Sequence, residues 1–201
     1  MTSNQPADPR PVYAAATRWA TDLIGGIRDD QLDSPTPCDD FDVRTLAGHL
    51  VAVAGRAVAL AERGDVDGTP RIDDRHDAAT YRQLSDHAIE LWADDAKLAA
   101  PVKVPWGDVP GAGALWGYVN ETLVHGWDLA VATGQDPEAD PALAQAALAV
   151  AQQFIPAAIR ADDGVPFDAV VEPRPGAGAT ERLANWSGRE STSWVSAVTT
   201  T

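Results

Sequence analysis

Apolar side chains recur along this chain with the 3.6-residue spacing of helices that bury one face. The spacing predicts five amphipathic helices, over about residues 12–27, 43–63, 78–98, 112–133 and 141–159. Capping residues fit two of the ends, because Asp42 precedes the second helix and Gly134 follows the fourth. The pattern therefore predicts an all-α protein, a four-helix bundle with added elements.

The segments outside these helices divide the chain further. Residues 102–110 are expected to form an extended connector between the third and fourth helices. The bundle core should span about residues 12–160, and residues 162–190 should form a C-terminal appendage with a short strand at 167–171 and a helix near 180–186. Residues 191–201 are expected to be flexible, and the whole of 1–201 is expected to be a single domain.

The charge of the chain narrows its partners. The sequence has 30 acidic against 15 basic residues, a formal net charge of −15. Such a surface repels phosphate backbones and anionic lipid headgroups, which excludes nucleic acid and membrane as expected partners. Cys38 is the single cysteine, and the polar N-terminus lacks the apolar segment of a secretory signal. We therefore expect a cytoplasmic protein that acts on a small-molecule substrate.

Two residues in the fourth predicted helix have the spacing of metal ligands. Glu121 and His125 lie four residues apart, so their side chains share one face of the helix. A carboxylate oxygen and an imidazole nitrogen both bind zinc, at about 2.0–2.2 Å. The same pair also occurs as an ordinary surface hydrogen bond. Here the surrounding residues are largely apolar, and a carboxylate buried among them needs a partner such as a cation.

His49 is the candidate for a third ligand. It lies in the apolar helix over residues 43–63, where the alternative is a core histidine bonded to a neighbouring group. Three such side chains facing inward from two helices favour a shared metal ion. His76 lies in a charged loop and His87 on a polar helix face, so neither is expected to be a ligand.

Other polar and aromatic residues lie near these three in the sequence. Asp128 follows His125 by one helical turn and is expected either to accept its second N–H or to be a surface carboxylate. Asp128 and Asn120 are the candidates for a further acid or base. Some of the three tryptophans are expected to line a pocket beside the metal and at least one to lie in the core: Trp106, Trp116 and Trp127.

Two segments of the chain resemble the signatures of a bacterial metal-binding family. Residues 36–50, TPCDDFDVRTLAGHL, are similar to the pattern TPC-x-x-W-x-V-R-x-L-x-x-H-L. Residues 106–111, WGDVPG, followed by residues 121–130, ETLVHGWDLA, match its second signature, and residues 167–189 resemble its closing segment. On these motifs the chain is identified as a member of the DinB-like superfamily, related to mycothiol-dependent maleylpyruvate isomerase.

The resemblance implies a fold, a ligand set and a class of chemistry. It implies a DinB-like four-helix bundle in which His49, Glu121 and His125 bind the metal. Phe41 stands where the family often has Trp, a difference that affects packing. Relatives include thiol-dependent transferases and isomerases and are often dimers, so a low-molecular-weight thiol such as mycothiol and a homodimer are further expectations.

Zinc is the expected metal, with nickel, iron or manganese as alternatives. Three protein ligands leave one position open, where a bound thiol or water loses a proton or a carbonyl becomes polarised. The leading hypothesis is a metal-dependent enzyme, a thiol S-transferase or isomerase. Two alternatives remain: a noncatalytic, stress-related metal- or ligand-binding protein, and a metal-dependent hydrolase or cyclase in a biosynthetic pathway.

Overall fold

Helices make up most of the protein, as the apolar spacing predicted. The computed structural model describes residues 7–105, 107–161 and 168–198. The described α-helices are α1 (Arg10–Gly25), α2 (Val43–Arg63), α3 (Ala78–Trp92), α4 (Asp95–Ala99), α5 (Gly111–Thr133), α6 (Pro141–Phe154), α7 (Ala179–Trp186) and α8 (Thr192–Val198). Two 3₁₀ turns, η1 (Asp29–Gln31) and η2 (Ala157–Ala161), and one hairpin complete the elements. The all-α class is therefore confirmed.

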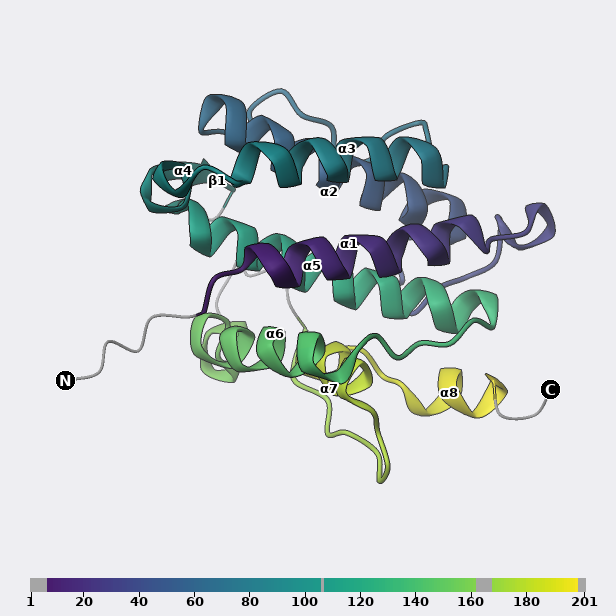
Figure 1. The fold of residues 1–201 in the computed structure, drawn as a ribbon. Helices are drawn as coiled ribbons and strands as arrows, with labels where there is room; N and C mark the ends of the chain where they lie inside the picture. Colours follow the sequence, from purple (N-terminus) through teal and green to yellow (C-terminus); the bar gives the residue numbers. More distant parts are fainter. Residues whose placement is uncertain (1–6, 106, 162–167, 199–201) are drawn as a thin grey trace.

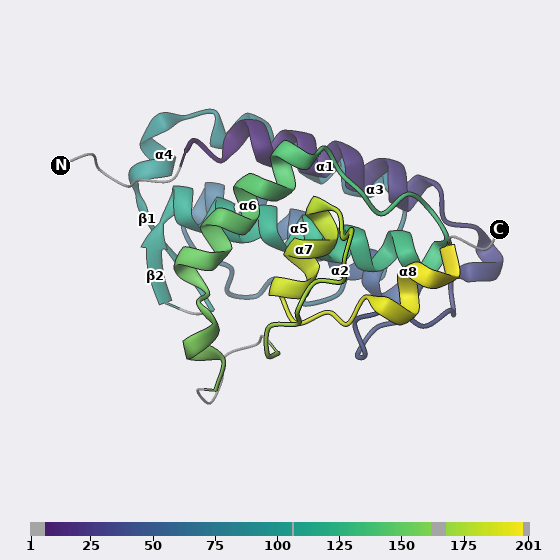
Figure 2. The same ribbon diagram turned by 90° about the horizontal axis from the view of Figure 1, so that it is seen from below.

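Four of the long helices form the bundle. Helix α1 packs against α3 and α5, and α2 packs against the same two helices, so the four enclose the buried apolar clusters between them (Figure 1). Helices α6, α7 and α8 cover the opposite side of α5 (Figure 2). Helix α5 is thus enclosed on both sides, and most of its residues are buried. Most polar side chains on α5 are consequently held away from bulk water.

Helix α2 has the bounds that the sequence predicted, because both of its ends carry strong local signals. The Asp42 side chain accepts a hydrogen bond from the Thr45 backbone N–H at 2.8 Å, and Gly64 ends the helix with φ of 80°. By length and composition alone α2 could cross a membrane, but 78% of its most apolar window is buried inside the bundle. Packing against neighbouring helices therefore explains its apolar character.

Two elements differ from the prediction. The helix expected over residues 78–98 is broken into α3 and α4, because the Asp94 side chain caps a new helix by accepting from the Ala96 N–H at 2.9 Å. The expected extended connector is an antiparallel hairpin of β1 (Pro101–Val104) and β2 (Gly107–Pro110), in register with Val102 opposite Val109. Trp106, between the two strands, lies outside the described residues.

The C-terminal part packs on α5. Helix α7 agrees with the prediction. Residues 168–171 form no strand, because the Val171 N–H donates a hydrogen bond to the Asn185 carbonyl near the end of α7 and not to a neighbouring strand. Phe167 lies outside the described residues. Helix α8 occupies part of the segment that we expected to be flexible, and Trp194 and Val195 on it pack against the cluster of Trp127, Val131 and Ala184.

Candidate metal centre

Helices α2 and α5 bring the three predicted ligands together. Glu121 Oε2 lies 3.4 Å from His49 Nε2 and 3.4 Å from His125 Nε2. One ligand atom from each residue lies within 4.8 Å of the other two. The two imidazoles meet edge to face, with ring centroids 4.9 Å apart. Both histidines are buried, whereas the Glu121 side chain is partly exposed, so the group is open on one side.

These separations match those between ligands of one metal ion. Two atoms that bind a tetrahedral zinc at about 2.0–2.1 Å lie about 3.3–3.4 Å from each other. A direct N–H···O hydrogen bond is most often about 2.9–3.0 Å long. Glu121 Oε2 therefore stands at ligand-to-ligand distance from both nitrogens, and these donor atoms fit a zinc ion.

The outer ring nitrogens determine which lone pairs face inward. His49 Nδ1 lies 2.9 Å from the Arg71 carbonyl oxygen, and His125 Nδ1 lies 3.0 Å from Asp128 Oδ2. A carbonyl and a carboxylate oxygen only accept hydrogen bonds, so each Nδ1 carries a hydrogen. In the neutral rings both Nε2 lone pairs then face Glu121. Three acceptors that converge in this way require a shared cation, either a proton or a metal.

Protons take this role where no metal is bound. Burial disfavours the charged form of His125, but hydrogen bonds to Asp128 and Glu121 outweigh it and raise its pKa to about 9. Burial also opposes ionisation of Glu121, yet hydrogen bonds from His125 and His49 hold its pKa well below the usual value. A metal that binds here must therefore displace a proton from His125 near neutral pH.

Asp128 is completely buried, which excludes the alternative that it is a surface carboxylate. Arg189, from the segment after α7, donates from Nε to Asp128 Oδ1 at 2.9 Å and from Nη2 to Oδ2 at 3.1 Å. Arg189 was not among the site residues predicted from the sequence. Its signal was present, since Arg189 ends the closing segment of the family resemblance. The candidate ligand His125 is thus bonded by a carboxylate that an arginine pairs with in turn.

A glycine beside His49 lets the loop over residues 64–77 approach α2. A Cβ on Gly48 would overlap the backbone oxygen of Asp73, and the Asp73 N–H donates to the Gly48 carbonyl at 3.0 Å. The same loop carries Arg71, whose carbonyl oxygen accepts from His49 Nδ1. The absence of a side chain at position 48 therefore allows the loop to orient His49.

The remaining predicted site residues lie elsewhere on α5. At 3.6 residues per turn, Trp116, Asn120 and Trp127 point roughly 100–140° away from Glu121 around the helix. The Trp116 indole donates to the Ala7 carbonyl at 3.0 Å, and Trp127 is buried in the cluster beneath α7 and α8. Asn120 is also buried. The prediction for Trp106 lies outside the described residues.

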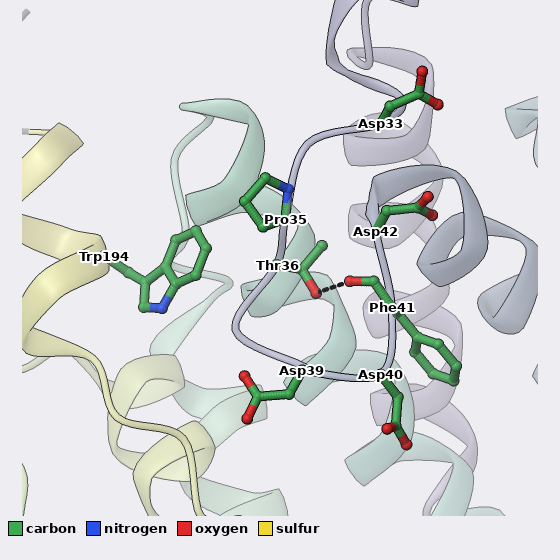
Figure 3. Close-up of a pocket in the computed structure, with 8 residues that line it drawn as sticks. All are labelled: Asp33, Pro35, Thr36, Asp39, Asp40, Phe41, Asp42 and Trp194. Carbon is green, nitrogen blue, oxygen red and sulfur yellow. Dashed lines mark hydrogen bonds between the residues drawn. The ribbon is translucent and has the colours of Figure 1, made fainter.

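A cavity of about 430 Å³ lies beside the loop that precedes α2. Figure 3 shows its lining residues, which are Asp33, Pro35, Thr36, Asp39, Asp40, Phe41, Asp42 and Trp194. Phe41 connects this wall to the candidate ligands, since its ring centroid lies 5.1 Å from that of His49 and 6.4 Å from that of His125. Trp194 contributes an indole to the wall of this cavity. The carboxylates favour neutral or cationic groups.

Cys38 lies close to the outer part of the centre. Its sulfur comes within 4.8 Å of ligand atoms of His125 and Asp128. Burial raises the pKa of the thiol, which keeps it protonated. The Asp128 carboxylate is already bonded by His125 and Arg189, so this second group is a poorer metal site than the first. Neither His76 nor His87 belongs to a candidate ligand group among the described residues, and the His87 side chain is exposed.

Comparison with known proteins gives the family. The family model described as the mycothiol maleylpyruvate isomerase N-terminal domain matches residues 13–130, a range that contains all three candidate ligands and Asp128. The chain is similar to the uncharacterized protein Rv0738 of Mycobacterium tuberculosis strain ATCC 25618 / H37Rv. It is equally similar to the uncharacterized protein MT0763 of M. tuberculosis strain CDC 1551 / Oshkosh.

Each of these two relatives is 32% identical over 160 residues, which cover 80% of this chain and 86% of the relative. No solved structure matches the chain significantly. The family match extends over more than half of the chain and includes the helices that carry the candidate ligands. The chain therefore belongs to the DinB-like family of the mycothiol maleylpyruvate isomerase N-terminal domain.

Proposed function

We propose that this protein binds one divalent metal ion, zinc in the first place, through His49, Glu121 and His125, and that it is a metal-dependent enzyme acting on a small molecule. The observation that carries the proposal is the pair of 3.4 Å separations from Glu121 Oε2 to the two Nε2 atoms. The hydrogen bonds at both Nδ1 atoms support it, because they direct the Nε2 lone pairs to one point.

Thiol chemistry suits this ligand set best. Two neutral imidazoles and one carboxylate leave a net charge of +1 on zinc, which favours an anionic fourth ligand such as a thiolate. A zinc ion in such a site supplies a lowered pKa for a bound thiol or water. Membership of a family described by a mycothiol-linked isomerase supports thiol S-transfer or isomerisation as the reaction. The proposed roles of the chain's residues are to bind the metal and to orient its ligands.

A noncatalytic metal-binding role is the alternative, and one observation favours it. Neither of the two residues considered as a further acid or base is available to a substrate at the metal. Asp128 is bonded by Arg189 and His125, and Asn120 points away from the ligand face of α5. In a reaction at this centre, protons would then have to be transferred by a group bound to the metal, by the thiol or by a functional group of the substrate.

The metal site is tested by elemental analysis of the purified protein after incubation with zinc and gel filtration. We expect one zinc per chain in the wild type and none in the double variant His49→Ala/His125→Ala. The control is His76→Ala/His87→Ala, which removes two histidines outside the centre and should keep the zinc. Equal zinc content in the wild type and the His49→Ala/His125→Ala variant would refute the site.

The thiol reaction needs a second experiment. Calorimetric titration of mycothiol into the zinc-loaded wild type should show binding, and the same titration into metal-free protein should not. Mycothiol-dependent isomerisation of maleylpyruvate would then distinguish catalysis from binding alone. An absence of mycothiol binding to fully zinc-loaded protein would contradict the thiol chemistry and leave the metal site standing.

A further inference from the structure

The C-terminal segment reaches the candidate metal centre through one side chain. Arg189 lies beyond the region that the family model matches, yet its guanidinium contacts the carboxylate that bonds His125. The Arg189 side chain is 14% exposed and that of Asp128 is 0% exposed. Two hydrogen bonds therefore connect Arg189 to the candidate metal ligand His125, one from Arg189 to Asp128 and one from His125 to Asp128.

The turn after α7 determines the direction of Arg189. Gly188 adopts a φ of 96°, and the Arg189 N–H closes the turn by bonding the Ala184 carbonyl at 2.9 Å. The Asn185 side chain donates to the Arg189 carbonyl at 2.8 Å. A Cβ at position 188 would lie 2.6 Å from Asp168 Cβ, so glycine is required for space as well as for conformation. The backbone of this turn thus determines where the Arg189 side chain begins.

The carboxylate of Asp128 needs this arginine in order to serve His125. A fully buried carboxylate is strongly disfavoured unless it is paired and hydrogen-bonded. Arg189 supplies the opposite charge and bonds both oxygens, while Oδ2 also accepts from His125 Nδ1. Without Arg189 the buried carboxylate would lose both hydrogen bonds and its opposite charge, so nothing would hold it in place as the acceptor that orients the His125 ring.

We propose that Arg189 is a positioning residue of the metal centre, acting through Asp128 to hold His125 Nε2 toward Glu121. The proposal rests on the metal binding proposed above. It has a reciprocal consequence, because two linked equilibria must affect each other by the same factor. Docking of the segment that carries Arg189 strengthens metal binding, and metal binding stabilises the docked segment.

A second arginine in the same segment provides a matched control. Arg174 donates to Glu181 from Nε and Nη2, each at 2.8 Å, and Glu181 is 2% exposed. Glu181 Oε1 accepts in addition from the Ser191 hydroxyl at 2.7 Å, and not from a metal ligand. Both pairs join an arginine to a buried carboxylate, although the Arg174 side chain is 33% exposed against 14% for Arg189, and only the Arg189 pair bonds His125.

The test measures zinc affinity by competition with a chromophoric chelator. We expect Arg189→Met to weaken zinc binding about tenfold or more, the lower end of the effect of losing an outer partner of a metal ligand. Asp128→Asn should weaken it at least as much, and the double variant no further than Asp128→Asn alone. Arg174→Met should lower the melting temperature and leave zinc affinity unchanged.

Two results would overturn the proposal. One is wild-type zinc affinity in Arg189→Met, and the other is an equal further loss when Arg189→Met is added to Asp128→Asn. Arg189→Lys covers the case in which the methionine variant does not fold, because it keeps the charge but not the paired hydrogen bonds. Its affinity should lie between those of the wild type and Asp128→Asn, and wild-type affinity in this variant would contradict the proposal.

Hydrogen exchange tests the reciprocal effect. Zinc should slow amide exchange in α7 and the turn after it in the wild type and in Arg174→Met, but not in Arg189→Met. Zinc-independent exchange in a wild-type protein that binds zinc would refute the coupling. A wild-type protein that binds no zinc refutes the proposed function, whereas normal binding that is insensitive to Arg189 refutes this inference alone.

Discussion

An alanine at position 48 would press on the loop that orients His49. A Cβ there would overlap the Asp73 backbone oxygen and lie 3.3 Å from Ile72 Cγ2. The loop must then retreat on the order of 1 Å to restore ordinary van der Waals contact. The carbonyl of Arg71, which accepts the 2.9 Å hydrogen bond from His49 Nδ1, moves with it. Gly48→Ala is therefore predicted to affect both stability and zinc binding.

The size of the effect follows from three contributions. Overpacking costs about 1–3 kcal/mol, and loss of the His49 hydrogen bond costs about 1 kcal/mol. Alanine in a helix returns about 0.5–1 kcal/mol relative to glycine. We expect Gly48→Ala to lower the free energy of unfolding by about 1–3 kcal/mol. Gly55→Ala is the control on the same helix, because its Cβ would meet no atom within 4 Å and should stabilise the protein.

Urea denaturation of the two variants measures the stability difference, and zinc titration measures the effect on the site. Zinc affinity should fall about tenfold in Gly48→Ala, since the partner of a ligand imidazole is displaced, and should not change in Gly55→Ala. The reasoning would be refuted if Gly48→Ala were as stable as Gly55→Ala and bound zinc as the wild type does.

Three further predictions concern the Asp42 helix cap, the pH dependence of zinc binding and the contact between Gly126 and Trp19. Hydrogen bonds from Thr45 lower the pKa of Asp42, so Asp42→Ala should lower the free energy of unfolding by about 1 kcal/mol at pH 7. Urea titrations should find this difference between the wild type and Asp42→Ala lost as the pH falls below about 4. Asp42→Asn should keep the cap. Zinc affinity should rise about tenfold per unit from pH 6 to 8, because the pKa of His125 is about 9 and a metal-bound imidazole carries no proton; a flat titration curve would contradict this. Gly126→Ala would overlap the Trp19 ring and should lower the melting temperature, unlike Gly113→Ala, whose Cβ comes no closer than 3.9 Å to its surroundings.

The fold was predictable where the local signals and the apolar spacing agreed. The bounds of α2 follow from the Asp42 cap and from Gly64. The break between α3 and α4 was missed because apolar positions continue to Leu98, and the capping side chain of Asp94 decides the local structure. The hairpin was missed because each strand has only four residues, too few to show an alternating pattern. The pairing of Val102 with Val109 also requires the chain to reverse between the strands, which the apolar spacing does not show.

The site was predictable to the extent that it is local. Glu121, His125 and Asp128 lie on one helix face by spacing alone, and His49 could be added as an inward histidine of a second helix. Spacing on the apolar helix α5 did not show which of its tryptophans lies in the core, and the structure buries both Trp116 and Trp127 there. Arg189 was not found, because its contact with α5 arises from the turn after α7, which spacing along the chain cannot show.

X-ray absorption at the zinc edge of the zinc-loaded protein shows directly whether one metal ion is bound by His49, Glu121 and His125. In a buffer without thiols, we expect nitrogen and oxygen ligands at about 2.0–2.2 Å and no sulfur ligand. The same spectrum should disappear with the bound zinc in His49→Ala/His125→Ala. A sulfur ligand at about 2.3 Å would place the zinc on Cys38 and would refute the proposed ligand set.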